Sequence, residues 1–380
     1  MHIHTQRVQP LDYMRGFAVI LMVMGHSIDS VLSPVSRTTE LFRFYDSVRG
    51  FTAPLFLFVS GFVFSVTTLR RWDAFVAFGA PARRRLTKML MLLGLGYALH
   101  FPFFSLNKIL YHTQPHEYAL MFQVDILHCL AVTIIMLQVV VVLARTPLRF
   151  AWISAGIAGV VALLSPLIWV SDITRVVPAI IAPYFNQSVP SLFPLFPFSA
   201  YLFTGAAVGM VYLRKREAGT EELFLRRVIQ AGLSLAVVGT LLDLQPIALY
   251  PPHDFWKAGP AFFLIRAGIV GAIAASAFRL RRLPPVVAEN LAALGQSSLI
   301  VYTVHLVLVY GSVVNPGLMQ IIGQRLDTAG AVVVALGVLT LMVTVVHVWK
   351  TLREVHYYPL RLTQAGFTTT LLYFFLTKPF

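Results

Sequence analysis

An arginine, a histidine and an aspartate near the start of the chain have the types and the spacing of a catalytic arrangement. Arg15 and His26 are 11 residues apart, and Asp29 follows three residues later. In an α-helix, a separation of 11 residues at ~100° each ends about 20° from a whole number of turns, so the three side chains lie near one face. The rise from Arg15 to His26 is then ~16 Å.

This spacing suits a donor substrate that has a charged end and a long, thin arm. Phosphates could bind Arg15, and an extended chain could follow the helix face to His26; acyl-coenzyme A has this shape. His26 would be the general base that deprotonates an acceptor hydroxyl or amine for attack on the thioester. Asp29 would fix the tautomer of His26 and stabilise its imidazolium form, as the third member of a triad does.

A purely structural interpretation of these residues stays open on spacing alone. Arg15 would then be an anchor at the edge of the membrane, and His26 would be a buried group that hydrogen-bonds to a neighbouring helix. Ionisable groups inside a span are nevertheless costly, so each is a functional candidate by default.

The elements that must position these residues are membrane-spanning helices. Of the 380 residues, 57% are hydrophobic and 12% are charged, and the mean hydropathy is +0.75; a soluble domain carries about 25% charged residues. This composition excludes a soluble enzyme, a disordered protein and a secreted disulfide scaffold. Cys129 is the single cysteine, which excludes an internal disulfide and a cysteine-based metal cluster, and we expect no metal.

Stretches of about 20 mostly apolar residues mark the spans. They predict an all-α, polytopic helical bundle with about ten transmembrane helices, forming a single membrane domain over residues 1–380. A short cytoplasmic N-terminus (1–10) and a C-terminal tail from about residue 350 flank the spans, and a proline-rich external loop is expected at about 171–192. The predicted spans are about 11–32, 48–69, 86–106, 120–144, 150–170, 193–213, 227–249, 259–278, 291–312 and 329–349.

The charge of the chain indicates its orientation. The net charge is +14, and with both termini inside, Lys and Arg favour the inner side by roughly three to one. We therefore predict an N-in/C-in topology, membrane lipids as partners and no nucleic-acid partner. The compact loops favour a bacterial inner (plasma) membrane, and a homodimer stays open.

Five segments, in order along the chain, resemble the membrane-bound acyltransferase 3 family and the related heparan-α-glucosaminide N-acetyltransferase-like family. They are LDYMRGFAVILMVMGH at the first span, APLFLFVSGFVF at the second, ARRRLTKMLMLL at the entry to the third, FPLFPFSAYLFTGAAVG in mid-chain and GQSSLIVYTVHLVLVY near the end. The first carries the (L/I)D-x-x-RG signature with a histidine 11 residues after the arginine.

The resemblance implies a cytoplasmic acyl-CoA donor, with acetyl-CoA the first choice, and a carbohydrate or lipid-linked acceptor that often faces away from the cytoplasm. By this analogy His26 is the catalytic residue and Arg15 its donor-side partner. Two other readings stay open: a secondary transporter or flippase, and a catalytically inactive scaffold. A transporter would usually show internal repeats and paired interrupted helices, and neither is clear in the sequence.

Further residues are assigned to the donor side. Arg70, Arg71 and Arg85 belong to a basic cluster that could attract donor phosphates, although ordinary positive-inside charge is the alternative. Ser60 is placed with them, although a Ser–Gly pair in a span is usually a close-packing device.

Four residues are assigned to the acceptor cavity. Asp125 and His128 are three residues apart and could bind acceptor or relay a proton; the alternative is a local hydrogen bond that holds the start of a helix. Tyr302 and His305 share one face of the ninth predicted span and could line the same cavity; the alternative is an interhelical hydrogen bond.

Overall fold

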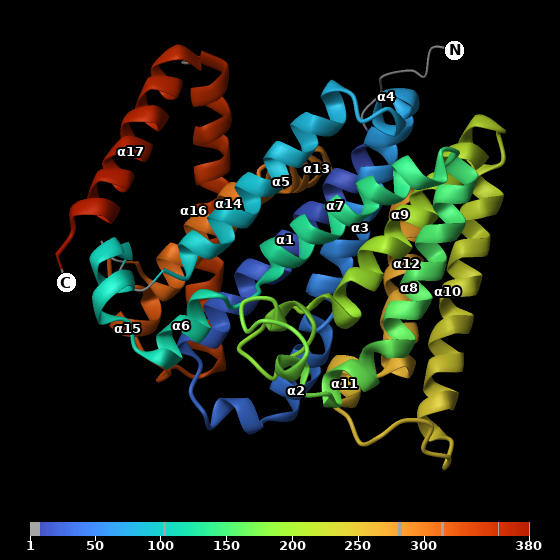
Figure 1. The fold of residues 1–380 in the computed structure, drawn as a ribbon, viewed down its shortest axis with the longest axis horizontal. Coiled ribbons are helices and arrows are strands. Elements are labelled where there is room, and N and C mark those ends of the chain that lie inside the picture. Colours follow the sequence, from blue (N-terminus) through green and yellow to red (C-terminus); the bar gives the residue numbers. More distant parts are fainter. Residues whose placement is uncertain (1–7, 102–103, 280–282, 313–314, 356, 380) are drawn as a thin grey trace. The chain divides into compact units, whose positions relative to one another are not determined.

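The structure is a computed structural model that describes residues 8–101, 104–279, 283–312, 315–355 and 357–379. Within these residues the chain forms helices, and β-structure is limited to isolated bridges such as Val124–Ser191 (Figure 1). The predicted all-α membrane fold is therefore confirmed. Residues 1–7 of the predicted cytoplasmic N-terminus lie outside the described residues.

The helices divide into two compact units, which are described separately. The prediction of a single domain over the whole chain stays a prediction. The first unit holds the end of α3 (Thr52–Leu69) and α4 (Trp72–Val76), α5 (Ala80–Leu99), α6 (Pro115–Met121), α7 (Ile126–Ala144), α8 (Pro147–Val170), α9 (Leu195–Glu217), α10 (Glu221–Leu244), α11 (Phe255–Ala258) and α12 (Pro260–Arg279). The second unit holds α1 (Gln9–Val31), α2 (Glu40–Arg49), the start of α3, α13 (Pro285–Gln296), α14 (Ser298–Tyr310), α15 (Leu318–Ile321), α16 (Thr328–Val355) and α17 (Tyr357–Thr377).

Eight helical segments of the described chain are long and apolar enough to cross a membrane, and a ninth span is possible if a bent helix pair counts as one. The predicted number of ten is not confirmed. The segments are Gln9–Val31, Glu40–Leu69, Ile126–Ala144, Pro147–Val170, Leu195–Glu217, Glu221–Leu244, Pro260–Arg279 and Thr328–Glu354.

Three predicted spans differ from the observed helices. The span predicted at 86–106 corresponds to α5, whose first half carries Arg83, Arg84, Arg85 and Lys88 and is therefore too polar. The span predicted at 120–144 begins only at Ile126, after a break that follows α6. The span predicted at 291–312 is interrupted: α13 and α14 meet at Ser297 with a bend of 80°.

The core of the second unit surrounds α1. Val19 and Val23 of α1 are buried in one cluster with Leu294 of α13, Val301 of α14 and Met342 of α16. At this depth one face of α1 packs against apolar side chains of α13, α14 and α16.

Two glycines let α1 and α13 approach closely. A Cβ atom on Gly16 would collide with the backbone carbonyl oxygen of Leu291, and one on Gly295 would collide with that of Asp12. Small residues allow such contacts between membrane helices, where close packing rather than the hydrophobic effect holds helices together. Gly16 follows Arg15 directly, so this contact fixes the depth of Arg15.

We expect Gly16→Ala to destabilise the protein by about 1–3 kcal/mol, because the new methyl group meets backbone that cannot move aside. Gly337→Ala is the matched control, since a Cβ atom at Gly337 of α16 meets nothing within 4 Å. Thermal unfolding in detergent should separate the two variants. Equal melting temperatures for them would show that α1 and α13 do not pack as described.

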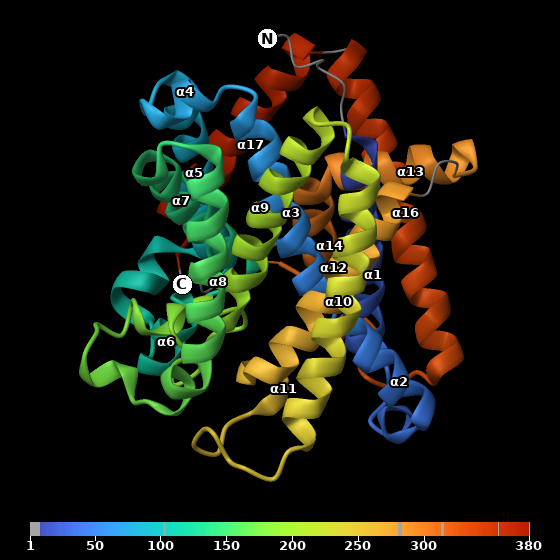
Figure 2. The same ribbon diagram turned by 90° about the vertical axis from the view of Figure 1, so that its right-hand side faces the viewer.

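Glycines also allow close contacts between helices of the first unit. A Cβ atom on Gly61 of α3 would collide with the carbonyl oxygen of Leu202 of α9, and one on Gly205 with that of Phe58. Helices α10 and α12 run side by side (Figures 1 and 2), in contact at Gly232 and Gly268.

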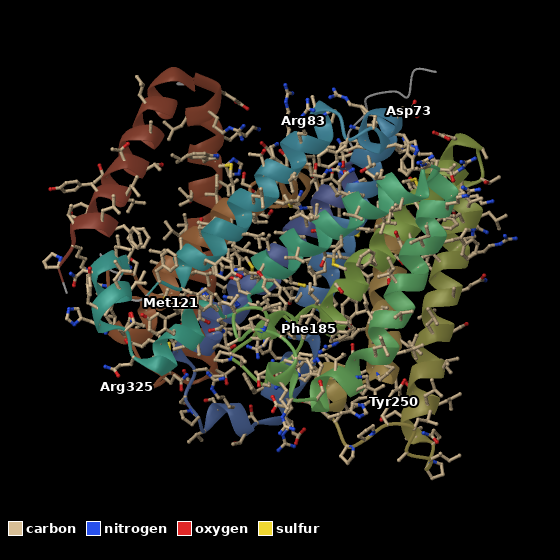
Figure 3. All side chains as sticks on the ribbon, in the orientation of Figure 1. Asp73, Arg83, Met121, Phe185, Tyr250 and Arg325 are labelled. Atoms are coloured by element: carbon tan, nitrogen blue, oxygen red, sulfur yellow. The ribbon has the colours of Figure 1, made fainter. Side chains whose placement is uncertain are left out.

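The stretch predicted as a proline-rich loop contains only the short 3-10 turns Ile173–Arg175 and Ala182–Tyr184. Figure 3 places Asp73 and Arg83 at one end of the first unit and Tyr250, in the connection between α10 and α12, at the other end.

The predicted C-terminal tail is helical over Tyr357–Thr377.

Candidate active site

Helix α1 positions Arg15, His26 and Asp29 in the second unit. The helix starts with a proline in its first turn, which suits the helical start because that position needs no donor. Arg15 and His26 both contact α14: Arg15 reaches Ser298, and His26 reaches His305. Both side chains therefore point toward one neighbouring helix, as the 11-residue spacing predicts.

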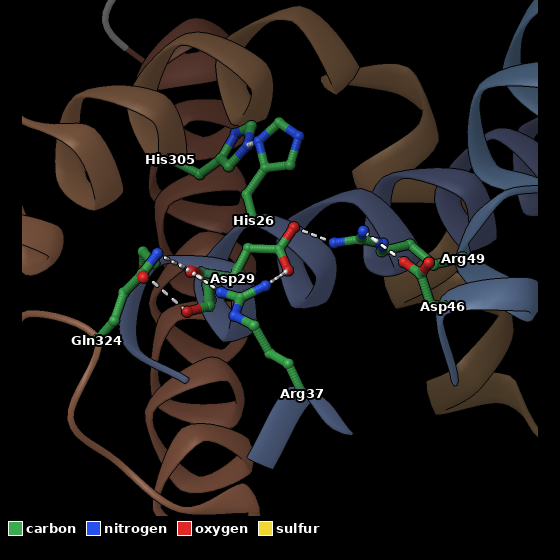
Figure 4. A network of polar contacts seen from close by, with 9 residues as sticks. His26, Asp29, Arg37, Asp46, Arg49, His305 and Gln324 are labelled. Atoms are coloured by element: carbon green, nitrogen blue, oxygen red, sulfur yellow. Dashed lines mark hydrogen bonds and ion pairs between the residues drawn. The ribbon is translucent and has the colours of Figure 1, made fainter. Parts of the chain in front are cut away.

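The two histidines are in direct hydrogen-bond contact (Figure 4). Nε2 of His305 lies 3.1 Å from Nδ1 of His26, and Nδ1 of His305 lies 2.7 Å from the backbone carbonyl oxygen of Val301. A carbonyl oxygen only accepts, so Nδ1 of His305 carries the hydrogen. In neutral His305, Nε2 is then an acceptor, and Nδ1 of His26 must donate to it.

This chain of two hydrogen bonds fixes the tautomer of His26. With its hydrogen on Nδ1, the neutral imidazole of His26 has its lone pair on Nε2. His305 is fully buried, and the rings of Tyr302 and Tyr310 stand edge-on to His305 and His26 at 5.9 Å and 5.7 Å between centroids. The arrangement can therefore supply an oriented, neutral base in largely apolar surroundings.

Asp29 does not have the contact that the sequence suggested for it. Its carboxylate is held by Arg37, at 3.3 Å, and by Arg49, while Arg49 also donates to Asp46 at 2.5 Å. The partner described on Nδ1 of His26 is His305 (Figure 4). Asp29 thus anchors the segment after α1 and the end of α2.

Sequence reasoning missed Arg37 and Arg49 as neighbours of this site. With the N-terminus inside, the connection between the first two predicted spans, 11–32 and 48–69, lies on the outer side, and both arginines lie in it or at its end. Because the positive-inside bias leaves such residues unexplained, their exceptional position near Asp29 was a usable signal.

The other end of α1 meets the break between α13 and α14. Nη2 of Arg15 donates to Oγ of Ser298, the first residue of α14, at 2.8 Å, and Nε2 of Gln296 donates to Asp12 at 3.4 Å. The N-terminal, positive dipole end of α14 therefore lies beside the Arg15 guanidinium. These are two positive groups that an anion could contact, with the Asp12 carboxylate close by.

The predicted donor-side residues Ser60, Arg70, Arg71 and Arg85 all lie in the first unit. Arg70 and Arg71 are exposed in the turn after α3. Ser60 precedes Gly61, which makes the close approach to α9; this favours the packing interpretation of the Ser–Gly pair.

Arg85 is held in a closely fitted pocket of neutral groups. Its guanidinium lies between the rings of Phe64 and Phe75, at 4.2 Å and 4.0 Å from the ring centroids. It donates to Thr68 at 2.9 Å, to Thr67 at 3.1 Å and to Gln138 at 3.3 Å. A planar cation between two rings gains cation–π attraction.

We expect Arg85→Lys to destabilise the protein by about 1–3 kcal/mol, because an ammonium cannot fill the flat slot or reach all three acceptors. Arg84→Lys is the matched control, since Arg84 is its exposed neighbour on α5. Thermal unfolding measures both. If Arg85→Lys melts like the control, Arg85 is not a structural residue of the first unit.

Asp125 and His128 also lie in the first unit, at the start of α7. Oδ1 of Asp125 accepts from the backbone N–H groups of Leu127 and His128 and lies 2.7 Å from Nδ1 of His128. Burial acts to raise the pKa of Asp125, but its hydrogen bonds with His128 outweigh it and lower the pKa. The pair caps the helix, as the local-hydrogen-bond alternative predicts.

Two comparisons with known proteins bear on this site. A family model described as an acyltransferase domain, that of the acyltransferase 3 family, matches residues 9–349. No curated protein matches the chain. The matched residues run from the start of α1 into α16 and so include Arg15, His26 and His305. The match does not reach the finer level of the heparan-α-glucosaminide branch, which stays a prediction.

Proposed function

The chain belongs to the acyltransferase 3 family and is a membrane acyltransferase; from this we propose that it transfers an acyl group from a cytoplasmic acyl-CoA to a hydroxyl or amine of a carbohydrate or lipid-linked acceptor. His26 is the general base in this proposal. The observation that carries it is the hydrogen-bond chain from Val301 through His305 to His26, which leaves the lone pair of His26 on Nε2.

The proposed reaction needs one base and balances without a cofactor. Nε2 of His26 takes the proton of the acceptor O–H or N–H as the acceptor oxygen or nitrogen attacks the thioester carbonyl. The carbon–sulfur bond then breaks, and the coenzyme A thiolate leaves and takes the proton back from the imidazolium. The new ester or amide is released.

In this proposal Arg15 and the start of α14 bind the donor's phosphates. The supporting observation is that the Arg15 guanidinium lies at the N-terminal, positive dipole end of α14. The distance along α1 to His26 is ~16 Å, which an extended pantetheine arm can follow. Acetyl is the first choice for the acyl group, and the exposed Arg70 and Arg71 are proposed to attract the donor by their charge.

We expect Arg15→Gln to raise the KM for acyl-CoA by roughly 10–100-fold, the loss of one charge-assisted hydrogen bond to phosphate. The effect on kcat should be much smaller, since Arg15 is far from the reacting atoms. Steady-state kinetics with acetyl-CoA and with acetyl-pantetheine, which lacks the nucleotide, test this. An Arg15→Gln enzyme that discriminates the two donors as well as wild type does would remove Arg15 from the donor site.

The bent helix pair α13–α14 is the feature of the described chain that a transporter would also show. Transporters use interrupted helices, but usually as a pair at corresponding places in two repeats. The described part of this chain has one bent pair. The break in this pair contacts Arg15, and no second bent pair among the described residues corresponds to it. This favours a role of the break in donor binding over a role in transport.

The deciding experiment uses purified protein in liposomes with acetyl-CoA labelled on the acetyl group. Free coenzyme A and label transfer are followed with a panel of sugars and a membrane-lipid extract. Transfer by wild type supports the proposal and identifies the acceptor class. If wild type neither binds acetyl-CoA nor releases coenzyme A with any acyl length tried, the donor assignment is wrong.

A further inference from the structure

An open hollow of about 510 Å³ lies in the first unit at the end of α8. Three segments form it: the last turn of α8, the irregular stretch that follows, and the start of α11. Its volume falls within the range of small-ligand pockets, about 300–1,000 Å³. The polar and aromatic residues that line it are Trp169, Ser171, Asp172, Gln187, Ser188, Asp254 and Lys257.

Hydrogen bonds hold the walls of this hollow in place. The indole Nε1 of Trp169 donates to the carbonyl oxygen of Phe196 at 2.7 Å. The buried Asn186 donates to the carbonyl oxygens of Ile168, at 2.7 Å, and Ser171, at 2.9 Å, which ties the irregular stretch to α8. Because these hydrogen bonds already fix the walls, a ligand would pay little ordering cost.

The charges of the lining exclude several ligand classes. Asp172 is bonded to Thr174 and Arg175, and these hydrogen bonds lower its pKa, so it is an ionised acceptor near neutral pH. Asp254 lies 3.5 Å from Lys257, which also donates to Gln187 at 3.4 Å.

The two cations at the hollow, Arg175 and Lys257, are each paired with a carboxylate, which disfavours phosphates and nucleotides. Both carboxylates already have cationic partners, which disfavours a metal ion. The many polar groups disfavour an acyl chain, because it would leave them without partners.

A neutral polyhydroxyl compound fits what remains. Carboxylate and amide oxygens accept from hydroxyl groups, the ammonium and hydroxyl of the lining donate to them, and an indole ring offers a rigid apolar face with little entropy cost. We propose that this hollow is a saccharide-binding site, in which Trp169 stacks on a sugar ring and Asp172, Gln187 and Asp254 bind its hydroxyl groups. This proposal does not rest on the acyl transfer proposed above.

The test is saturation-transfer difference NMR on the full chain in lipid nanodiscs, without any acyl donor. Maltose and N,N′-diacetylchitobiose are the saccharide probes, and inorganic phosphate, followed by the line width of its ³¹P signal, is the anionic probe. We expect at least one saccharide to bind wild type and phosphate not to bind the hollow. Asp254→Asn should weaken saccharide binding by roughly ten-fold, and Trp169→Ala should abolish it.

Matched variants make each outcome decisive. Asp243→Asn removes the same charge at an exposed position near the end of α10, outside the hollow, and should bind saccharide like wild type. Saccharide binding that is lost in His26→Ala but kept in Asp254→Asn would lie at the proposed acceptor site instead, which separates this proposal from the catalytic one. If Trp169→Ala does not fold, the exposed Asp254 variant decides alone. Absence of saccharide binding to wild type, or binding unchanged by Asp254→Asn, would overturn the proposal.

Discussion

Replacing His26 by alanine is expected to reduce acyl transfer by ~10²–10⁴-fold, the usual contribution of a general base. The hydrogen-bond chain through His305 orients this imidazole for the reaction. Binding of acyl-CoA should persist, since the proposed phosphate site at Arg15 is ~16 Å away along α1. Coenzyme A release and equilibrium binding of labelled acetyl-CoA measure the two steps separately.

His347→Ala is the matched control for this variant. His347 of α16 lies in the same unit, and its Nε2 is hydrogen-bonded to Asn290 of α13 at 2.9 Å. Its replacement therefore also removes one interhelical imidazole contact, but it touches no residue of the proposed reaction. If both variants lose transfer to the same extent, the loss reflects helix packing. If His26→Ala transfers acyl groups at the wild-type rate, His26 is not the base.

The parts of this site that the sequence predicts are those set by local geometry. Spacing along one helix is fixed by 100° per residue, so the sequence alone places Arg15 and His26 on one face. The apolar composition likewise predicts membrane helices, because the lipid environment leaves few alternatives. The ordered motifs predict the family, and the match over residues 9–349 confirms it.

The parts that the sequence does not predict depend on partners distant in the chain. His305 is 279 residues from His26, and nothing local shows that it rather than Asp29 holds the imidazole. Asp29 instead pairs with Arg37 and Arg49, which follow it by 8 and 20 residues. The span predicted at 86–106 begins after Arg85, whereas α5 begins at Ala80 and ends at Leu99. The observed helix therefore includes four basic residues and lacks the apolar residues that follow Leu99.

Exchange of His305 for leucine is expected to lower kcat by ~10²–10³-fold while the KM for acyl-CoA changes little. Without the acceptor at Nε2 of His305, Nδ1 of His26 has no partner, and the imidazole can adopt the tautomer whose lone pair faces the wrong way. A misplaced tautomer costs a triad enzyme about 10⁴-fold, and a smaller loss is expected here because the partner is neutral. His305 is thus a positioning residue, and the change in kcat measures its effect.

His305→Gln separates this positioning role from packing. A glutamine amide oxygen can accept from Nδ1 of His26, so this variant should recover a large part of the kcat that leucine loses.

Asp29→Asn tests the assignment that the spacing suggested. If Asp29 oriented His26, the Asp29→Asn variant would lose as much kcat as His305→Leu; the hydrogen-bond network predicts a smaller loss. Equal kcat values for the glutamine and leucine variants, with similar thermal stabilities, would reduce His305 to a space-filling residue. The effect on kcat of a hydrogen-bond acceptor at position 305 therefore shows whether neutral His305 or the carboxylate of Asp29 orients His26.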